Sequence, residues 1–254
     1  AGAYRGYGAT QGIFAVESMV NRLADKLGMD PLEIRYKNMT HEGDVMPAYY
    51  GETTNSCKLE DCLRKASDMI GWEKKPLRQV MPDGKIRGLG TAMAMQGSAI
   101  SNCDVGSVTI KLSDEGFYNV IVGCTDMGTG CDTIIAQFVA DSLDTDIDNI
   151  AVFGVDTDTS PYDSGSYASS TTYLTGMAAV KAAEQMREKL LQLAAKILEE
   201  DITKLEFDGK RVFCEETGKE VSLFDLATAS MVNNEIALEV TYSHSSPLSP
   251  PPFM

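Results

Sequence analysis

Three stretches of small residues lead directly into predicted helices, and each could bind an anionic group. They cover residues 5–10, 127–130 and 164–172 and are rich in Gly, Ser, Thr and Ala. A helix N-terminus offers unpaired N–H donors and the positive end of the helix dipole, and small residues let a ligand's oxygens approach the backbone. Three such starts in one chain predict a large, phosphate-bearing cofactor. Two alternatives stay open: tight connections with Ser or Thr caps, or another phosphate-bearing ligand near Gly128 and Gly165.

Other kinds of site have little support in the sequence. The first stretch lacks the glycine spacing of a dinucleotide-binding fingerprint, and no Walker lysine follows Gly128 or Gly130. His41 and His244 are the only imidazoles, and both are best explained as surface or capping residues. The six cysteines form no C-x-x-C motif, so we predict neither a zinc site nor an iron–sulfur site, but buried, reduced thiols in a cytoplasmic protein.

The elements that must position these stretches are helices mixed with hairpins. Apolar residues at steps of three and four predict an amphipathic helix from Ile13 to Leu27, ending at Gly28. Further elements are predicted by periodicity and turn signals: helices over 31–39, 59–70, 131–143, 173–200 and 223–231, hairpins over 105–122 and 205–214, strands over 150–155 and 236–242, and an ordered loop over 43–55.

Strands and helices do not alternate regularly, so the predicted fold class is α+β, in two subdomains of mixed sheets and helices. A turn signal at residues 82–84 separates a helical segment, residues 1–81, from an α+β lobe, residues 82–254. The chain opens in a Gly-rich stretch and closes on a Pro-rich one, so we expect the lobe to be incomplete at both ends and the chain to be cut from a longer one.

Composition excludes two classes of partner. Of the 254 residues, 43% are hydrophobic and 23% are charged, which is typical of a soluble folded protein. No apolar run approaches the roughly 20 residues of a membrane span. The formal net charge of −15 has the wrong sign for binding nucleic acid or anionic lipid. We therefore expect neither nucleic acid nor a membrane as partner.

Short motifs follow one another along most of the chain in an order that suggests a family. They are GAYRGYG at 2–8 with Gln11, Phe14-Ala15, Glu17, LGMDPLEIR at 27–35 with Asn38, TDMGTG at 125–130, DTDT at 156–159, and GSYAS at 165–169 with Gly176. Together they resemble the molybdenum-binding part of the xanthine dehydrogenase and aldehyde oxidase family. The resemblance implies a molybdopterin-binding domain.

The implied activity of the full enzyme is hydroxylation of a carbon next to nitrogen in a purine-like heterocycle, or of an aldehyde, at a molybdenum held by the dithiolene of molybdopterin. Oxygen would come from water. Electrons would leave through iron–sulfur clusters, with or without FAD, in other domains or subunits of an oligomeric enzyme. The alternative is a non-enzymatic module, derived from the same lobe, that binds the cofactor or a partner.

The resemblance also implies roles by position. Arg5 and Gly6 would line the cofactor, with Arg5 and Ala168 near the molybdenum, while Tyr7 would take the place of a phenylalanine that packs on the substrate. Gly128 and Thr129 would meet the phosphate side. Ser169 and Thr171 would donate hydrogen bonds to the pterin. The cofactor contacts of this loop as a whole would come from Gly165, Ser166, Tyr167, Ala168, Ser169 and Thr171.

This sequence departs from the family pattern at three points. Thr129 stands where glutamine is common, and Tyr167 is larger than the usual small residue beside the metal. The glutamate base of the family, in a Gly-x-Gly-Glu-like motif far downstream, has no counterpart here. We therefore assign no catalytic residue and no protein ligand to the metal, and we expect the chain by itself to be inactive and to lack the cofactor.

Overall fold

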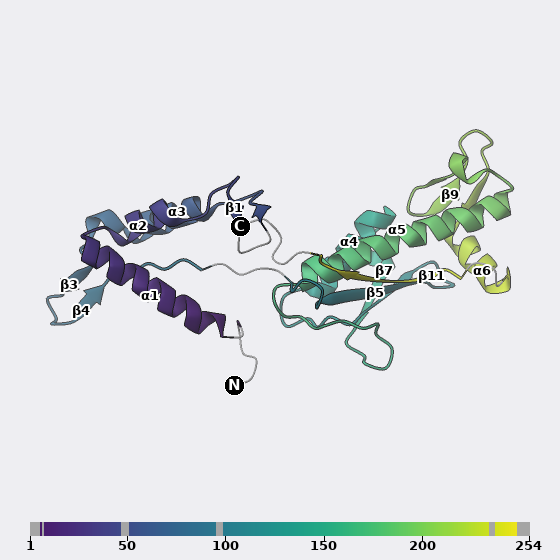
Figure 1. Ribbon diagram of the computed structural model, residues 1–254. Coiled ribbons are helices and arrows are strands. Elements are labelled where there is room, and N and C mark those ends of the chain that lie inside the picture. Colours follow the sequence, from purple (N-terminus) through teal and green to yellow (C-terminus); the bar gives the residue numbers. More distant parts are fainter. Residues whose placement is uncertain (1–5, 7, 47–50, 95–98, 234–236, 248–254) are drawn as a thin grey trace. The chain divides into compact units, whose positions relative to one another are not determined.

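The computed structural model describes residues 6, 8–46, 51–94, 99–233 and 237–247 (Figure 1). The described residues form two compact units, one within residues 1–96 and one within residues 97–249. Residues 82–94, which follow the predicted boundary at residue 81, belong to the first unit. The division into lobes at residue 81 stays a prediction. Among the described residues, no helix has both the length and the apolar character needed to cross a membrane.

The first unit is built mainly of helices and short hairpins. It contains α1 (Ala9–Leu27), α2 (Pro31–Asn38), β1 (Val45–Met46), β2 (Glu52–Thr53), α3 (Leu59–Ile70), a 3-10 turn η2 (Trp72–Lys74), β3 (Arg78–Val80) and β4 (Ile86–Gly88). Gly28 and Gly71 end α1 and α3 in the left-handed conformation, at φ 65° and 69°. The three predicted helices are therefore confirmed, and the expected loop at 43–55 contains the short pair β1–β2.

A small apolar core holds this unit together. Leu32, Leu63 and Trp72 form its buried cluster. The Asp30 carboxylate accepts the N–H of Leu32 at 2.7 Å and the indole N–H of Trp72 at 3.0 Å, so one side chain both caps α2 and fixes the core tryptophan.

The predicted apolar stripe of α1 is largely uncovered within this unit. Val16, Leu23 and Leu27 are 60%, 49% and 58% exposed, whereas Ala24, on the neighbouring face, is fully buried. The helix is amphipathic as predicted, but the described residues bury a different strip of its surface.

The second unit is centred on a four-stranded sheet in the order β11-β5-β6-β7. Its strands are β5 (Val105–Leu112), β6 (Tyr118–Val122), β7 (Ile150–Gly154) and β11 (Glu239–Ser245). β5 pairs antiparallel with β6 and with β11, which confirms the predicted hairpin. β6 and β7 pair in parallel because α4 (Cys131–Leu143) forms the crossover between them.

The long helix α5 (Thr171–Leu198) packs on β5 and β11 and against α4, as Figure 1 shows. Close approach is possible because Gly106 lies in β5 beneath the start of α5. A Cβ atom at this position would lie 2.5 Å from the Thr175 amide nitrogen and 2.7 Å from its Cα. This contact fixes the N-terminal turn of α5, and with it the loop before the helix.

Smaller elements close the core of the second unit. They are η3 (Ile147–Asn149), η4 (Ile202–Lys204), β8 (Glu206–Phe207), β9 (Arg211–Phe213), β10 (Glu220–Ser222) and α6 (Leu223–Asn233), with a three-stranded sheet in the order β10-β9-β8. The predicted hairpin at 205–214 is confirmed, whereas β10 was not predicted and β11 begins three residues later than expected. Mixed sheets and helices confirm the α+β fold class.

Candidate functional site

The loop before α4 is held by one carboxylate. Asp126 Oδ1 accepts the backbone N–H groups of Gly128 at 2.7 Å, Thr129 at 3.0 Å and Gly130 at 3.2 Å. These hydrogen bonds lower the pKa of the Asp126 carboxyl. The loop amides that lead into α4, as far as its N-cap residue Gly130, are therefore bound by the chain's own anion.

The loop before α5 is tied to both α5 and the first loop. Asp163 accepts the Gly165 N–H at 2.8 Å and the Thr175 hydroxyl at 3.0 Å. The Ser166 hydroxyl accepts the Thr125 N–H at 2.8 Å and donates to the Thr125 carbonyl at 2.9 Å. Two loops about 40 residues apart are thus joined side by side.

A cavity of about 410 Å³ lies between these two loops. Six residues predicted to bind the cofactor line it: Thr129, Ser166, Tyr167, Ala168, Ser169 and Thr171. Five further lining residues were not assigned a role from the sequence: Met127, Cys131, Ile134, Ser170 and Thr172. Membership in the small-residue stretches was the available signal for three of them, Met127, Ser170 and Thr172. Cys131 and Ile134 belong to α4 and carried no such signal.

The other predicted residues stand outside this lining. Gly128 and Gly165 lie in the same two loops, with φ 91° and 115°. Gly6 belongs to the first unit, so the structure does not place it at this cavity. Arg5 and Tyr7 lie outside the described residues.

The start of α5 differs electrostatically from the start of α4. No side chain caps either helix, but the first turn of α4 contains Asp132, whereas that of α5 contains no acidic residue. The Ser170 hydroxyl at the start of α5 donates to the Tyr167 carbonyl at 2.6 Å. Ala168 and Ser169 adopt the left-handed conformation, at φ 51° and 53°. An uncapped helix start bordered by hydroxyl groups suits a ligand rich in hydrogen-bond acceptors or negative charge.

Two thiols lie beneath the loop before α4. Cys124 and Cys131 are buried and interact with one another, and burial raises the pKa of each thiol. The prediction of buried thiols is confirmed for these two and for Cys214, but it is wrong for Cys62 and Cys103, which are exposed. Ligand atoms of Asp126, Cys131 and Asp132 lie within 4.8 Å of one another. Because Asp126 Oδ1 already accepts three backbone N–H groups, we assign no metal centre to this group.

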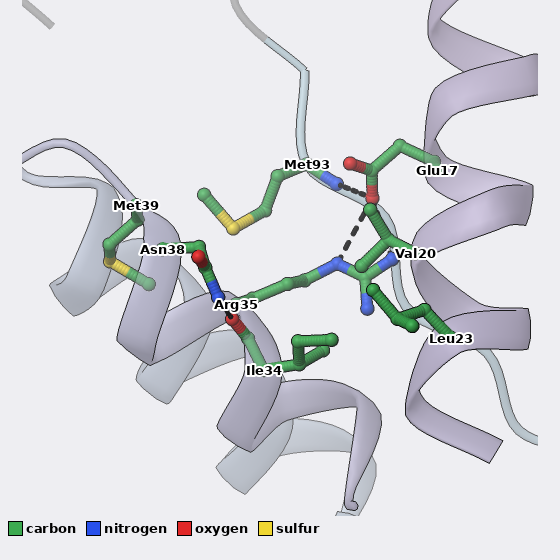
Figure 2. A pocket seen from close by; sticks show the side chains of 8 residues that line it. All are labelled: Glu17, Val20, Leu23, Ile34, Arg35, Asn38, Met39 and Met93. Atoms are coloured by element: carbon green, nitrogen blue, oxygen red, sulfur yellow. Dashed lines mark hydrogen bonds and ion pairs between the residues drawn. The ribbon is translucent and has the colours of Figure 1, made fainter. Parts of the chain in front are cut away.

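The first unit has a cavity of about 330 Å³ where α1 faces α2 (Figure 2). Arg35 Nε and Nη2 donate to Glu17 Oε2 at 3.0 and 2.7 Å, and the Met93 N–H donates to the same oxygen at 2.9 Å. Arg35 also donates to the Pro31 carbonyl at 2.7 Å, and its side chain is only 3% exposed. Glu17 and Arg35, which both lie in the family motifs, thus form an ion pair that connects α1, α2 and the segment after β4.

Comparison with known proteins gives a consistent result. A family model described as "Molybdopterin cofactor-binding domain" matches residues 65–253, and a second with the same description matches residues 1–39. The chain is 34% identical over its whole length to a xanthine dehydrogenase molybdenum-binding subunit of Escherichia coli O157:H7, and 38% identical over 89% of its length to a probable hypoxanthine oxidase of Escherichia coli K12. It spans 35% and 24% of these two relatives.

A solved structure shares the fold. Quinoline 2-oxidoreductase from Pseudomonas putida 86 superposes with a TM-score of 0.71 at 23% identity, over 97% of this chain and 34% of that one. At this level of identity the likeness concerns the fold alone, and it agrees with the α+β class derived from the sequence.

Proposed function

The chain belongs to the molybdopterin cofactor-binding domain family, and on this premise we propose that it forms part of the large subunit of a xanthine dehydrogenase-like molybdenum hydroxylase. The proposed reaction is oxidative hydroxylation of a purine-like heterocycle, which places the enzyme in purine metabolism. Similar proteins named for xanthine and hypoxanthine support a purine over an aldehyde.

One observation carries the proposal: predicted cofactor residues from two distant loops line a single cavity. The donor set fits the group. Molybdopterin presents phosphate oxygens and many pterin acceptors and donors, and the cavity offers hydroxyl groups beside an uncapped helix start. When bound, molybdopterin supplies the redox-active molybdenum at which the substrate is hydroxylated.

We assign the chain's own residues the following roles. Ser169 and Thr171 donate hydrogen bonds to the pterin, and Ala168 borders the space for the molybdenum. Gly128 and Thr129 meet the phosphate side. Because the amides of both residues already donate to Asp126, this contact comes from the Thr129 hydroxyl unless the carboxylate turns away.

Further parts of the proposed enzyme come from outside the second unit. Arg5 and Gly6 would complete the cofactor contacts, and Tyr7 would pack on the substrate. Iron–sulfur clusters, with or without FAD, would accept the electrons in other domains or subunits of an oligomer. The catalytic glutamate would also lie outside this chain, so that the chain alone is inactive. Six free cysteines support a cytoplasmic location.

Cofactor content tests the proposal. The enzyme that contains this chain should hold molybdenum and pterin in equal amounts and oxidise hypoxanthine with an artificial acceptor, and the chain alone should do neither. Thr171→Val and Ser169→Ala should each speed cofactor release roughly two- to tenfold, the value of one hydrogen bond. Thr228→Val, an exposed position on α6, is the matched control. Cofactor binding without turnover would favour the non-enzymatic module, and oxidation of aldehydes alone would exclude the purine assignment.

A further inference from the structure

Asp104 is a buried carboxylate that is not itself among the residues lining the cavity. It lies immediately before β5, and its side chain is completely buried. Its Oδ1 accepts the Tyr167 hydroxyl at 2.6 Å, and its Oδ2 accepts the Ile100 N–H at 2.7 Å. Burying a carboxylate is costly unless its oxygens are hydrogen-bonded, and these two contacts provide one hydrogen bond to each oxygen of Asp104.

Residues 99–104 form two hydrogen bonds with the cavity loop. One is the side-chain hydrogen bond to Tyr167. The other is a backbone bond, in which the Ala99 N–H donates to the Ala168 carbonyl at 3.0 Å. The segment is itself closed by the Asp104 N–H, which donates to the Ile100 carbonyl at 3.0 Å. Asp104 therefore connects a hydrogen-bonded turn to the loop.

The loop needs such support because its backbone is strained. Ala168 and Ser169 are consecutive non-glycine residues in the left-handed region, which L-residues adopt only when their surroundings hold them there. The Tyr167 hydroxyl bond to a carboxylate, at 2.6 Å, is of the short, charge-assisted kind. It anchors the residue directly before the strained pair.

We propose that Asp104 is a positioning residue of the cofactor site, acting through Tyr167 to hold residues 167–171 in the shape that faces the cavity. This inference rests on the proposed function. It also gives Tyr167 a specific role: its hydroxyl is bonded to Asp104, and the residue itself lines the cavity.

The test compares variants of the enzyme that contains this chain. Asp104→Asn keeps the shape but removes the charge, and Tyr167→Phe keeps the ring but removes the hydroxyl. Cofactor release is followed by the fluorescence of the freed pterin, at a temperature where circular dichroism shows every variant to be folded. Each variant should release the cofactor about tenfold faster, since Tyr167→Phe removes a hydrogen bond to a charged group and Asp104→Asn leaves only a weaker, neutral one. The double variant should also be about tenfold faster, because both substitutions act on the same bond.

The control is Val212→Ala, which opens the core at β9, away from the cavity, and lowers stability without touching the loop. Release from this variant should match the unsubstituted enzyme. Unchanged release from Asp104→Asn and Tyr167→Phe, or a roughly hundredfold effect in the double variant, would overturn the positioning role. If Ser169→Ala and Thr171→Val still accelerate release, only this inference fails; if they too have no effect, the proposed cofactor site fails with it.

Discussion

Replacing Gly106 by alanine should loosen the contact between β5 and α5. The added Cβ would lie 2.5 Å from the Thr175 amide nitrogen and 2.7 Å from its Cα, whereas nonbonded carbon atoms settle at about 3.5–4.0 Å. The helix must therefore move away from the strand by about 1 Å. Both partners are backbone atoms in regular elements, so no side-chain rotation can relieve the overlap.

The expected cost is near the upper end of the range for overpacked cores, about 3 kcal/mol. The shift should also reach the cavity, because Thr175 donates to Asp163, and Asp163 accepts the Gly165 N–H. Gly154→Ala is the matched control, since a Cβ at that position in β7 meets its nearest atoms at 3.5–3.7 Å, an ordinary contact distance. This control should change stability by less than about 0.5 kcal/mol.

Urea unfolding, followed by circular dichroism, measures both variants. Gly106→Ala should lower the midpoint with an unchanged slope, and Gly154→Ala should leave it in place. Equal stability of the two variants would show that α5 can shift freely on the sheet, and would refute the view that this glycine fixes the start of the helix.

Three further predictions concern charges and thiols. Glu17→Gln should destabilise the first unit by about 3 kcal/mol in thermal or urea unfolding, because it leaves the buried Arg35 without a counter-ion. Cys124 should resist iodoacetamide at pH 8 while Cys62, which is exposed, reacts, since burial raises the pKa of the Cys124 thiol; mass spectrometry locates the label. Amide hydrogen bonds lower the pKa of Asp126, so the charged carboxylate stabilises the folded loop at pH values above its unfolded pKa of about 3.9, and this stabilisation is lost as the pH falls through the folded pKa. An NMR titration of the Gly128 amide should detect the transition, and Asp126→Asn should abolish it.

The prediction for Glu17 has a matched control in the chain. Glu33 pairs with Lys37 on the surface, where the two side chains are 51% and 61% exposed, so Glu33→Gln should cost less than about 1 kcal/mol. A similar loss from both glutamate variants would contradict the argument from burial. Rapid labelling of Cys124 in the folded protein, or an Asp126 titration above its ordinary range, would contradict the other two.

Local signals in the sequence predicted most of the elements. Glycine at the C-terminus of α1 and of α3, and the Asp30-Pro31 start of α2, act over one helical turn, and a sequence window contains all the atoms involved. β10 lacked such a signal because it is only three residues long and is held as a strand by its pairing with β9. The uncovered stripe of α1 has a related cause, since amphipathicity indicates which face is apolar but not which part of a protein covers it.

The cavity was predictable in its residues but not in its construction. Small residues before a helix identified both loops, and family motifs added their roles. The contacts that shape the loops join positions far apart in the sequence: Ser166 with Thr125, and Tyr167 with Asp104. Such pairs follow from the fold of the sheet and helices, which brings the loop before α5 beside the end of β6 and the start of β5.

The two helix starts at the cavity were equivalent in the sequence and are not equivalent in the structure. At α4, the loop carries its own carboxylate four residues before Gly130, and that carboxylate takes three amides. At α5, no acidic residue occupies the first turn, and the nearest capping hydroxyl donates to a carbonyl instead. The unbalanced positive end of a helix dipole is therefore at α5. We therefore expect the pterin acceptors, assigned to Ser169 and Thr171, to turn toward α5, whereas the phosphate side meets the neutral Thr129 hydroxyl on the opposite side of the cavity.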